Sequence, residues 1–262
     1  MDEFLVKVLV VGVMVAILAA LVGVPMVLRR NAMLSDGLSH VGFGAFMIAM
    51  ALGFTPLYVA LPIVILVSFL ILRLGKNAKV TGDAAIAMMS VSALAVGMLI
   101  ASATGVDVDV DHVLFGDEML VVENAEIVIA SICFVAAAIF YVAFYNKIFA
   151  ISFDEKFARA IGIKVDVYNA IFALICSVVV VLGMRVMGAL LISALVVFPT
   201  LISKMICKNF KGVVVSSAVV SAVCLVVGVL ISNFLNLPTG PVVVVCNLSL
   251  YLVVWILNKA FK

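Results

Sequence analysis

The chain has 262 residues, of which 67% are hydrophobic and 11% are charged, and its mean hydropathy is +1.42. No soluble globular domain of this length has such a composition, so the sequence predicts a protein that crosses a membrane many times. The five cysteines stand singly in apolar segments. This spacing excludes a paired-cysteine zinc motif and does not indicate a disulfide framework.

Spans of roughly 20 apolar residues follow one another along the whole chain. We predict an all-α membrane helix bundle that forms one transmembrane domain over residues 1–262, with about nine spans. Eight spans remain possible, because the break at Met184–Gly188 is short. The predicted spans are Leu5–Leu28, Leu38–Phe54, Leu57–Leu74, Ala84–Ala103, Ile127–Tyr145, Tyr168–Gly183, Ala189–Ile206, Val213–Phe234 and Val242–Leu257.

The Lys and Arg residues of the loops, except Arg185, fall on one predicted side of this bundle. Cytoplasmic loops are enriched in Lys and Arg, so the pattern predicts a plasma-membrane protein with its N-terminus outside and its C-terminus in the cytoplasm. The opposite side holds an acidic segment, Gly105–Glu126, that lacks Lys and Arg. This segment is either a solvated loop, a landing surface for a receptor, or a funnel that attracts cations. The candidate funnel residues are Asp107, Asp109, Asp111 and His112.

A polar stretch, Ser35–His40, leads into the second span. Asp36 and His40 are four residues apart, so on a helix both side chains project from the same face. A carboxylate and an imidazole are ligands that suit zinc and its first-row neighbours, and titratable groups that enter a membrane span are read as functional by default. The alternative is structural, with Asp36 capping the helix and His40 bonded to a carbonyl.

A second polar stretch, Asn146–Val167, follows the fifth span. Ser152 and Glu155 have the spacing of a capping box, which predicts a short helix that starts at Ser152 and ends at Gly162 in the left-handed conformation. An apolar face would hold Phe153, Phe157 and Ile161. Such a helix either lies on the lipid headgroups or docks a soluble partner.

Several chemistries are missing from the sequence. Gly75-Lys76 lacks the other residues of a P-loop, so the chain cannot use nucleotide energy through such a motif of its own. The arrangements typical of hydrolases and zinc proteases are also absent, so we do not expect an enzyme. Spans three to nine contain no Asp, Glu or Lys near their centres, which disfavours the proton relays of secondary transporters.

Six blocks of sequence, in this order, carry a resemblance to a known family. The chain resembles, over essentially its whole length, the membrane permease of ABC-type zinc, manganese and iron importers, the family often called ABC-3. A more distant cousin, the permease of siderophore and cobalamin importers, lacks the Asp–His pair. The blocks are Arg29–Ala32 with Ser35–His40, Gly82–Ile86, Leu114–Asp117, Phe153–Gly162, Arg185–Pro199 and Leu237–Pro241.

The resemblance implies a type II ABC importer permease that acts as a homodimer in the lipid bilayer. It implies two further partners, a cytoplasmic ATPase and an extracellular or periplasmic metal-binding protein, and no nucleic acid. Asp36 and His40 match the metal-path ligands, and the metal ion is cargo rather than a permanently bound cofactor. The alternatives are a siderophore or cobalamin permease and a metal carrier that needs no ATPase. The segment that matches the ATPase-coupling helix comprises Phe153, Asp154, Glu155, Phe157, Ala158, Arg159 and Gly162.

Overall fold

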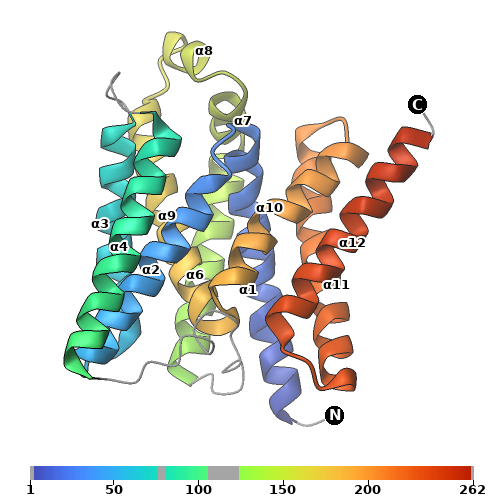
Figure 1. The fold of residues 1–262 in the computed structure, drawn as a ribbon. Coiled ribbons are helices and arrows are strands. Elements are labelled where there is room, and N and C mark those ends of the chain that lie inside the picture. Colours follow the sequence, from blue (N-terminus) through green and yellow to red (C-terminus); the bar gives the residue numbers. More distant parts are fainter. Residues whose placement is uncertain (1–2, 76–80, 106–123, 261–262) are drawn as a thin grey trace.

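The computed structural model describes residues 3–75, 81–105 and 124–260, and its regular secondary structure in these ranges is helical throughout. Most of the helices run between the same two ends of one bundle (Figure 1). In chain order they are α1 (Glu3–Leu28), α2 (Met33–Ala51), α3 (Pro56–Leu74), α4 (Gly82–Thr104), α6 (Asn124–Ala143), α7 (Tyr145–Phe153), α8 (Glu155–Ala160), α9 (Val165–Met187), α10 (Ala189–Ile206), α11 (Phe210–Leu235) and α12 (Thr239–Ala260).

The number of spans agrees with the sequence-based prediction. Within the described residues, eight helices are long and apolar enough to cross a membrane. A ninth crossing arises if the bent pair Phe134–Ala143 and Tyr145–Phe153 counts as one span, with a 74° bend between its halves. The two chain termini lie at opposite ends of the bundle (Figure 1), which requires an odd number of crossings. The all-helical membrane fold is therefore confirmed, and nine crossings fit it best.

Two predicted boundaries next to the candidate sites were wrong by more than a turn. The second span was predicted to begin at Leu38, but α2 begins at Met33, so Asp36 lies inside the helix. Hydropathy alone misplaced this boundary because the first turns of α2 are polar yet packed: Ser35 and Ser39 are almost fully buried. The stretch from Asn146 onward was predicted as a polar connection, but it is helical through Phe153 as α7.

The position of α2 is fixed by close packing inside the bundle. In the α2 span 72% of the residues are buried, whereas the share is 22% in α3 and 17% in α12. Gly44 of α2 and Gly97 of α4 let the two backbones touch, because a Cβ on Gly44 would lie 2.3 Å from the carbonyl oxygen of Ala93. Gly23 of α1 approaches the backbone of Val196 on α10 in the same way. Such a core transmits displacement instead of absorbing it.

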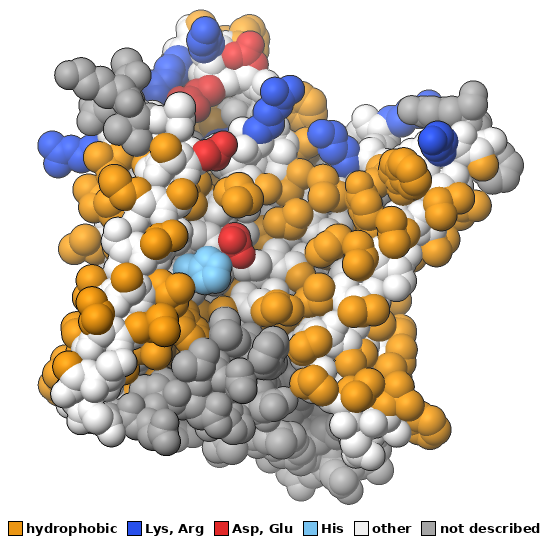
Figure 2. Space-filling model, viewed as in Figure 1, with side chains coloured by type: hydrophobic (Ala, Val, Ile, Leu, Met, Phe, Trp, Pro, Cys, Tyr) orange, Lys and Arg blue, Asp and Glu red, His pale blue; other side chains and the backbone are white. Residues whose placement is uncertain are grey.

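The charged side chains divide the surface into zones. On the face seen in Figure 2, Lys and Arg gather at one end of the bundle, and the wall below them is largely apolar. This end contains the α1–α2 turn with Arg29 and Arg30, and also α8. Among the described residues, the Lys and Arg seen on this face therefore share the end that the sequence predicted for the basic loops. That this end faces the cytoplasm stays a prediction.

Candidate functional site

The first candidate site is the pair Asp36 and His40, which α2 carries on one face. Three and seven residues separate them from the first residue of α2, which places them about 5 Å and about 10 Å along the helix axis. The Oδ2 atom of Asp36 lies 3.8 Å from Nε2 of His40, and the two side chains are 47% and 41% exposed. His40 is the only histidine among the described residues, and in Figure 2 the histidine lies in the apolar wall beside an acidic side chain.

Two contacts that the structural alternative predicts, a cap from Asp36 and a carbonyl bond from Nδ1 of His40, are not found. Asp36 cannot be the N-cap, because that position belongs to Ala32 and Asp36 lies four residues further on. The Nδ1 atom of His40 is buried and has no hydrogen-bond partner, so the expected bond to a carbonyl is not found at this nitrogen. The two side chains are therefore left to face one another and the accessible space beside α2.

Neighbouring polar groups hold the backbone of this turn in place. Ser39 lies between the pair in sequence, and its Oγ donates to the carbonyl of Asp36 at 2.7 Å. The same Oγ lies 3.1 Å from Oγ of Ser193, and this hydroxyl contact joins α2 to α10. Sequence reasoning did not assign a role to this serine pair, since 154 residues separate its members and no local spacing signals the contact.

The pair can bind one divalent metal ion but cannot enclose it. Bonds from zinc to a carboxylate oxygen or an imidazole nitrogen measure about 2.0–2.2 Å. Two such bonds sum to more than the 3.8 Å between the atoms, so a single ion can reach both. Within the described ranges, no group of three or more His, Cys, Asp or Glu side chains could hold a metal. The described residues therefore supply at most an open site with two ligands from α2.

The second candidate site is the segment from α7 to α8 at the basic end. The predicted capping box was wrong, because α7 continues through Ser152 and ends at Phe153. Asp154 instead caps α8, where its Oδ1 accepts from the amide of Phe157 at 3.0 Å. The error has a physical cause. Ser152 is only 6% exposed, because α7 continues through it and packs it into the bundle, so no helix begins at this residue. Gly162 has φ of +86°, which confirms the predicted left-handed residue.

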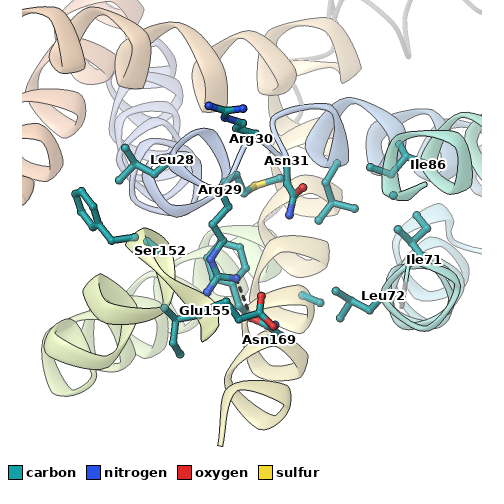
Figure 3. A pocket seen from close by; sticks show the side chains of 18 residues that line it. Leu28, Arg29, Arg30, Asn31, Ile71, Leu72, Ile86, Ser152, Glu155 and Asn169 are labelled. Atoms are coloured by element: carbon teal, nitrogen blue, oxygen red, sulfur yellow. Dashed lines mark hydrogen bonds between the residues drawn. The ribbon is translucent and has the colours of Figure 1, made fainter. Parts of the chain in front are cut away.

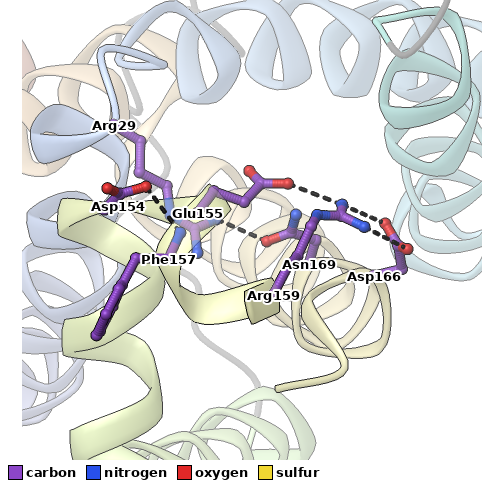
Figure 4. Close-up of polar contacts among 7 residues, drawn as sticks. All are labelled: Arg29, Asp154, Glu155, Phe157, Arg159, Asp166 and Asn169. Carbon is purple, nitrogen blue, oxygen red and sulfur yellow. Dashed lines mark hydrogen bonds and ion pairs between the residues drawn. The ribbon is translucent and has the colours of Figure 1, made fainter. Parts of the chain in front are cut away.

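Polar contacts fix this segment to the start of α9. Arg159 donates to Glu155 at 2.9 Å and to both carboxylate oxygens of Asp166 at 2.9 and 3.1 Å. The hydrogen bonds that Arg159 donates to Asp166, and then the one to Glu155, raise the pKa of Arg159 further above its ordinary value. Ala158 is fully buried and packs against Ile151 and Val165. The predicted coupling residues are thus brought together in one short, braced element (Figure 4).

An apolar surface remains on the outside of this element. Phe153, Phe157 and Ile161 are each more than half exposed, although all three are large hydrophobic residues. Phe157 points away from the polar network that involves Arg159 (Figure 4), while Phe153 stacks at 4.8 Å on Phe149. The predicted apolar face therefore exists and is open.

The candidate outer funnel cannot be placed in the same way. Asp107, Asp109, Asp111 and His112 lie outside the described residues. Their role stays a prediction.

Comparison with known proteins finds a family whose members resemble nearly the full chain. The model of the ABC 3 transport family matches residues 1–258. The chain belongs to this family. The match includes both the α2 pair and the α7–α8 segment.

Two relatives and one solved structure illustrate the similarity. A probable metal transport system membrane protein of Thermotoga maritima is 31% identical, covering 93% of this chain and 86% of the relative. The manganese import system permease protein ScaB of Streptococcus gordonii is 26% identical, covering 96% and 90%. The structure of PsaBC from Streptococcus pneumoniae in complex with Fab matches with a TM-score of 0.85 and 26% identity, covering 97% of this chain and 91% of that one. The chain is thus similar to the two relatives in sequence over most of their length, and to the solved structure in fold.

Proposed function

We propose that this chain is the membrane permease of an ATP-driven importer that carries a divalent transition-metal ion, Zn²⁺, Mn²⁺ or Fe²⁺, into the cytoplasm. The observation that carries the proposal is the Asp36–His40 pair, 3.8 Å apart and accessible on an otherwise buried helix. Membership of a transport family supports the proposal. Similarity to a probable metal transport protein and to a manganese import permease also supports it.

The ion passes the pair as cargo. Asp36 supplies a carboxylate oxygen and His40 supplies Nε2, while water or the matching face of a second copy of the chain completes the coordination. A second copy is favoured because the pair opens on an accessible, largely apolar surface. Partial coordination suits transport, because an ion that is bound too tightly could not leave.

Energy for the transport step comes from a separate cytoplasmic ATPase. The ATPase seats its cleft on the α7–α8 segment, where Phe153, Phe157 and Ile161 offer an exposed apolar face. The bracing of Arg159 by Glu155 and Asp166 keeps that face rigid, which reduces the entropy lost on docking. A metal-binding receptor delivers the ion at the opposite end.

The experiment compares uptake with and without the energy source. Proteoliposomes containing the permease, its ATPase and the receptor are supplied in turn with labelled Zn²⁺, Mn²⁺ and Fe²⁺. The proposal predicts uptake of at least one ion that requires both ATPase and hydrolysable ATP. Equal uptake by the permease alone would instead identify a carrier that needs no ATPase. The ion that competes best against the other two identifies the cargo.

A further inference from the structure

A cavity of about 600 Å³ lies at the basic end of the bundle, away from the Asp36–His40 pair. Its walls come from the α1–α2 turn, the adjoining ends of α3 and α4, the α7–α8 junction and the start of α9 (Figure 3). Neither candidate site explains the cavity: Asp36 and His40 do not line it, and of the apolar docking face only Phe153 does.

Two hydrogen-bonding groups in the wall of this cavity lack partners. The guanidinium of Arg29 reaches down from the turn and donates from one Nη to Oδ1 of Asn169 at 2.8 Å, but its Nε is buried and has no partner. The Oγ of Ser152 is also unpartnered, and Ser152 is 94% buried, since only 6% of its surface is exposed. Buried donors are almost always satisfied in folded proteins, so these two atoms indicate a ligand that accepts hydrogen bonds.

The charges around the cavity indicate the sign of that ligand. Its lining contains two arginines, Arg29 and Arg30, against one acid, Glu155. The carboxylate of Glu155 is already hydrogen-bonded to Arg159 at 2.9 Å, whereas the Arg29 guanidinium bonds to the neutral amide of Asn169. A net positive lining with a partly buried guanidinium favours an anion, and a planar fork of N–H donors suits a phosphate group in particular.

Much of the remaining wall of the cavity is apolar, and the cavity lies next to the ends of two candidate membrane spans. The α1 span ends at Leu28, directly before Arg29, and α3 ends at Leu74. Beside the arginines the wall is formed by hydrophobic side chains that include Leu34, Ile71 and Ile86. Lipid phosphates lie at this level of a bilayer, where basic pockets between helices bind headgroups.

We propose that this cavity binds a phosphate group, held by the guanidinium of Arg29 and the hydroxyl of Ser152. The phosphate belongs either to an anionic phospholipid headgroup or to free inorganic phosphate. A bound phosphate would join the turn that leads into α2 to the end of α7, and so join the helix of the ion pair to the docking segment. Only this functional consequence rests on the proposed function, because binding can be measured without transport.

The experiment measures binding to the purified full chain in two separate arms. In one arm, native mass spectrometry counts lipids retained after transfer from vesicles of phosphatidylcholine with or without phosphatidylglycerol. In the other arm, thermal unfolding in phosphatidylcholine nanodiscs is recorded with inorganic phosphate or with chloride at equal ionic strength. Retention of phosphatidylglycerol over phosphatidylcholine identifies the lipid as the source, whereas stabilisation by phosphate identifies the free anion.

Variants of the cavity wall decide whether the bound phosphate occupies this cavity. Arg29→Gln should weaken binding about tenfold, the effect of losing one charge-assisted hydrogen bond, and Ser152→Ala should weaken it less. Leu72→Trp, which enlarges a side chain of the cavity wall on α3 and leaves both donors in the sequence, should also reduce binding if Arg29→Gln does not fold. The matched control is Arg73→Gln, an exposed arginine at the same end that does not line the cavity. Binding of neither ligand, or equal binding by the wild type, Ser152→Ala and Leu72→Trp, would overturn the proposal.

Discussion

The two candidate sites are incomplete in opposite ways. At the ion pair the helix is closely packed, since α2 touches α4 backbone to backbone. Its polar groups are not fully hydrogen-bonded: Asp36 and His40 lie 3.8 Å apart, and Nδ1 of His40 has no partner. At α8 the polar groups of Asp154 and Arg159 are satisfied, but the apolar face is uncovered.

The difference indicates what each region expects from outside the chain. Unsatisfied oxygen and nitrogen ligands on a rigid helix are suited to a small cation that must arrive and leave. An uncovered aromatic face on a braced element is suited to a protein surface that stays attached. Variants that remove the ligands, the packing, the apolar face or the cap should therefore have distinct effects, and loss of the ligands should have the largest.

Removing the ligands of the pair should have the largest effect. Asp36→Asn and His40→Ala should each abolish metal uptake by the reconstituted importer, because each leaves a single protein ligand from this chain. Insertion in the membrane and association with the ATPase should not change, since both side chains are partly exposed. The matched control is Asp83→Asn, an acid in the first turn of α4. Normal uptake by the double variant would exclude the pair from the ion path.

Breaking the packing beneath the pair tests whether rigidity matters there. Gly44→Val would drive a side chain into the backbone of Ala93, which cannot rotate away, so we expect a loss of about 3 kcal/mol, the upper end for overpacking. The readout is the midpoint of thermal unfolding in detergent. Gly82→Ala is the control, because a Cβ at that glycine meets nothing within 4 Å. If both variants unfold at the wild-type midpoint, α2 is not held by this contact.

Uncovering the docking face tests the second region. Phe157→Ala should weaken association of the ATPase by about 2 kcal/mol, or roughly 30-fold, if the ring is an interface hot spot. Co-purified ATPase per permease and metal-stimulated hydrolysis report the effect. Phe234→Ala, at a ring that is 85% exposed at the other end of the bundle, is the matched control. A lipid-lying helix predicts wild-type stoichiometry in both variants.

Removing the cap of α8 should produce the smallest effect. Asp154→Ala deletes the acceptor for the amide of Phe157 and should cost about 1 kcal/mol of local stability. The segment would fray while Arg159 still holds it to Asp166. Hydrogen exchange at the amides of α8 should accelerate, and Ser152→Ala should leave this exchange unchanged. Acceleration in Ser152→Ala but not in Asp154→Ala would restore the capping box that the sequence predicted.

The accuracy of the sequence-based prediction depended on the range of the interactions. The spans were predicted well because hydropathy is a local property, and the spacing of Asp36 and His40 was sufficient to place them on one helix face. The start of α2 and the cap of α8 were wrong because burial against distant helices outweighs local polarity at Ser35 and Ser152.

Contacts between distant residues could not be predicted from one sequence. Arg29 and Asn169 are 140 residues apart and Ser39 and Ser193 are 154 apart, and neither contact leaves a periodic or spacing signal. Two donors are too few for a closed metal site, but the spacing of Asp36 and His40 does not identify the groups that would complete it.

The location of the bound ion tests the central claim most directly. Anomalous scattering from Zn²⁺ or Mn²⁺ bound to the assembled importer would locate the ion independently of activity. The account predicts a peak about 2.0–2.2 Å from Nε2 of His40 and from a carboxylate oxygen of Asp36, and no such peak in His40→Ala. An ion held by other residues, at the same place in the wild type and in His40→Ala, would contradict it.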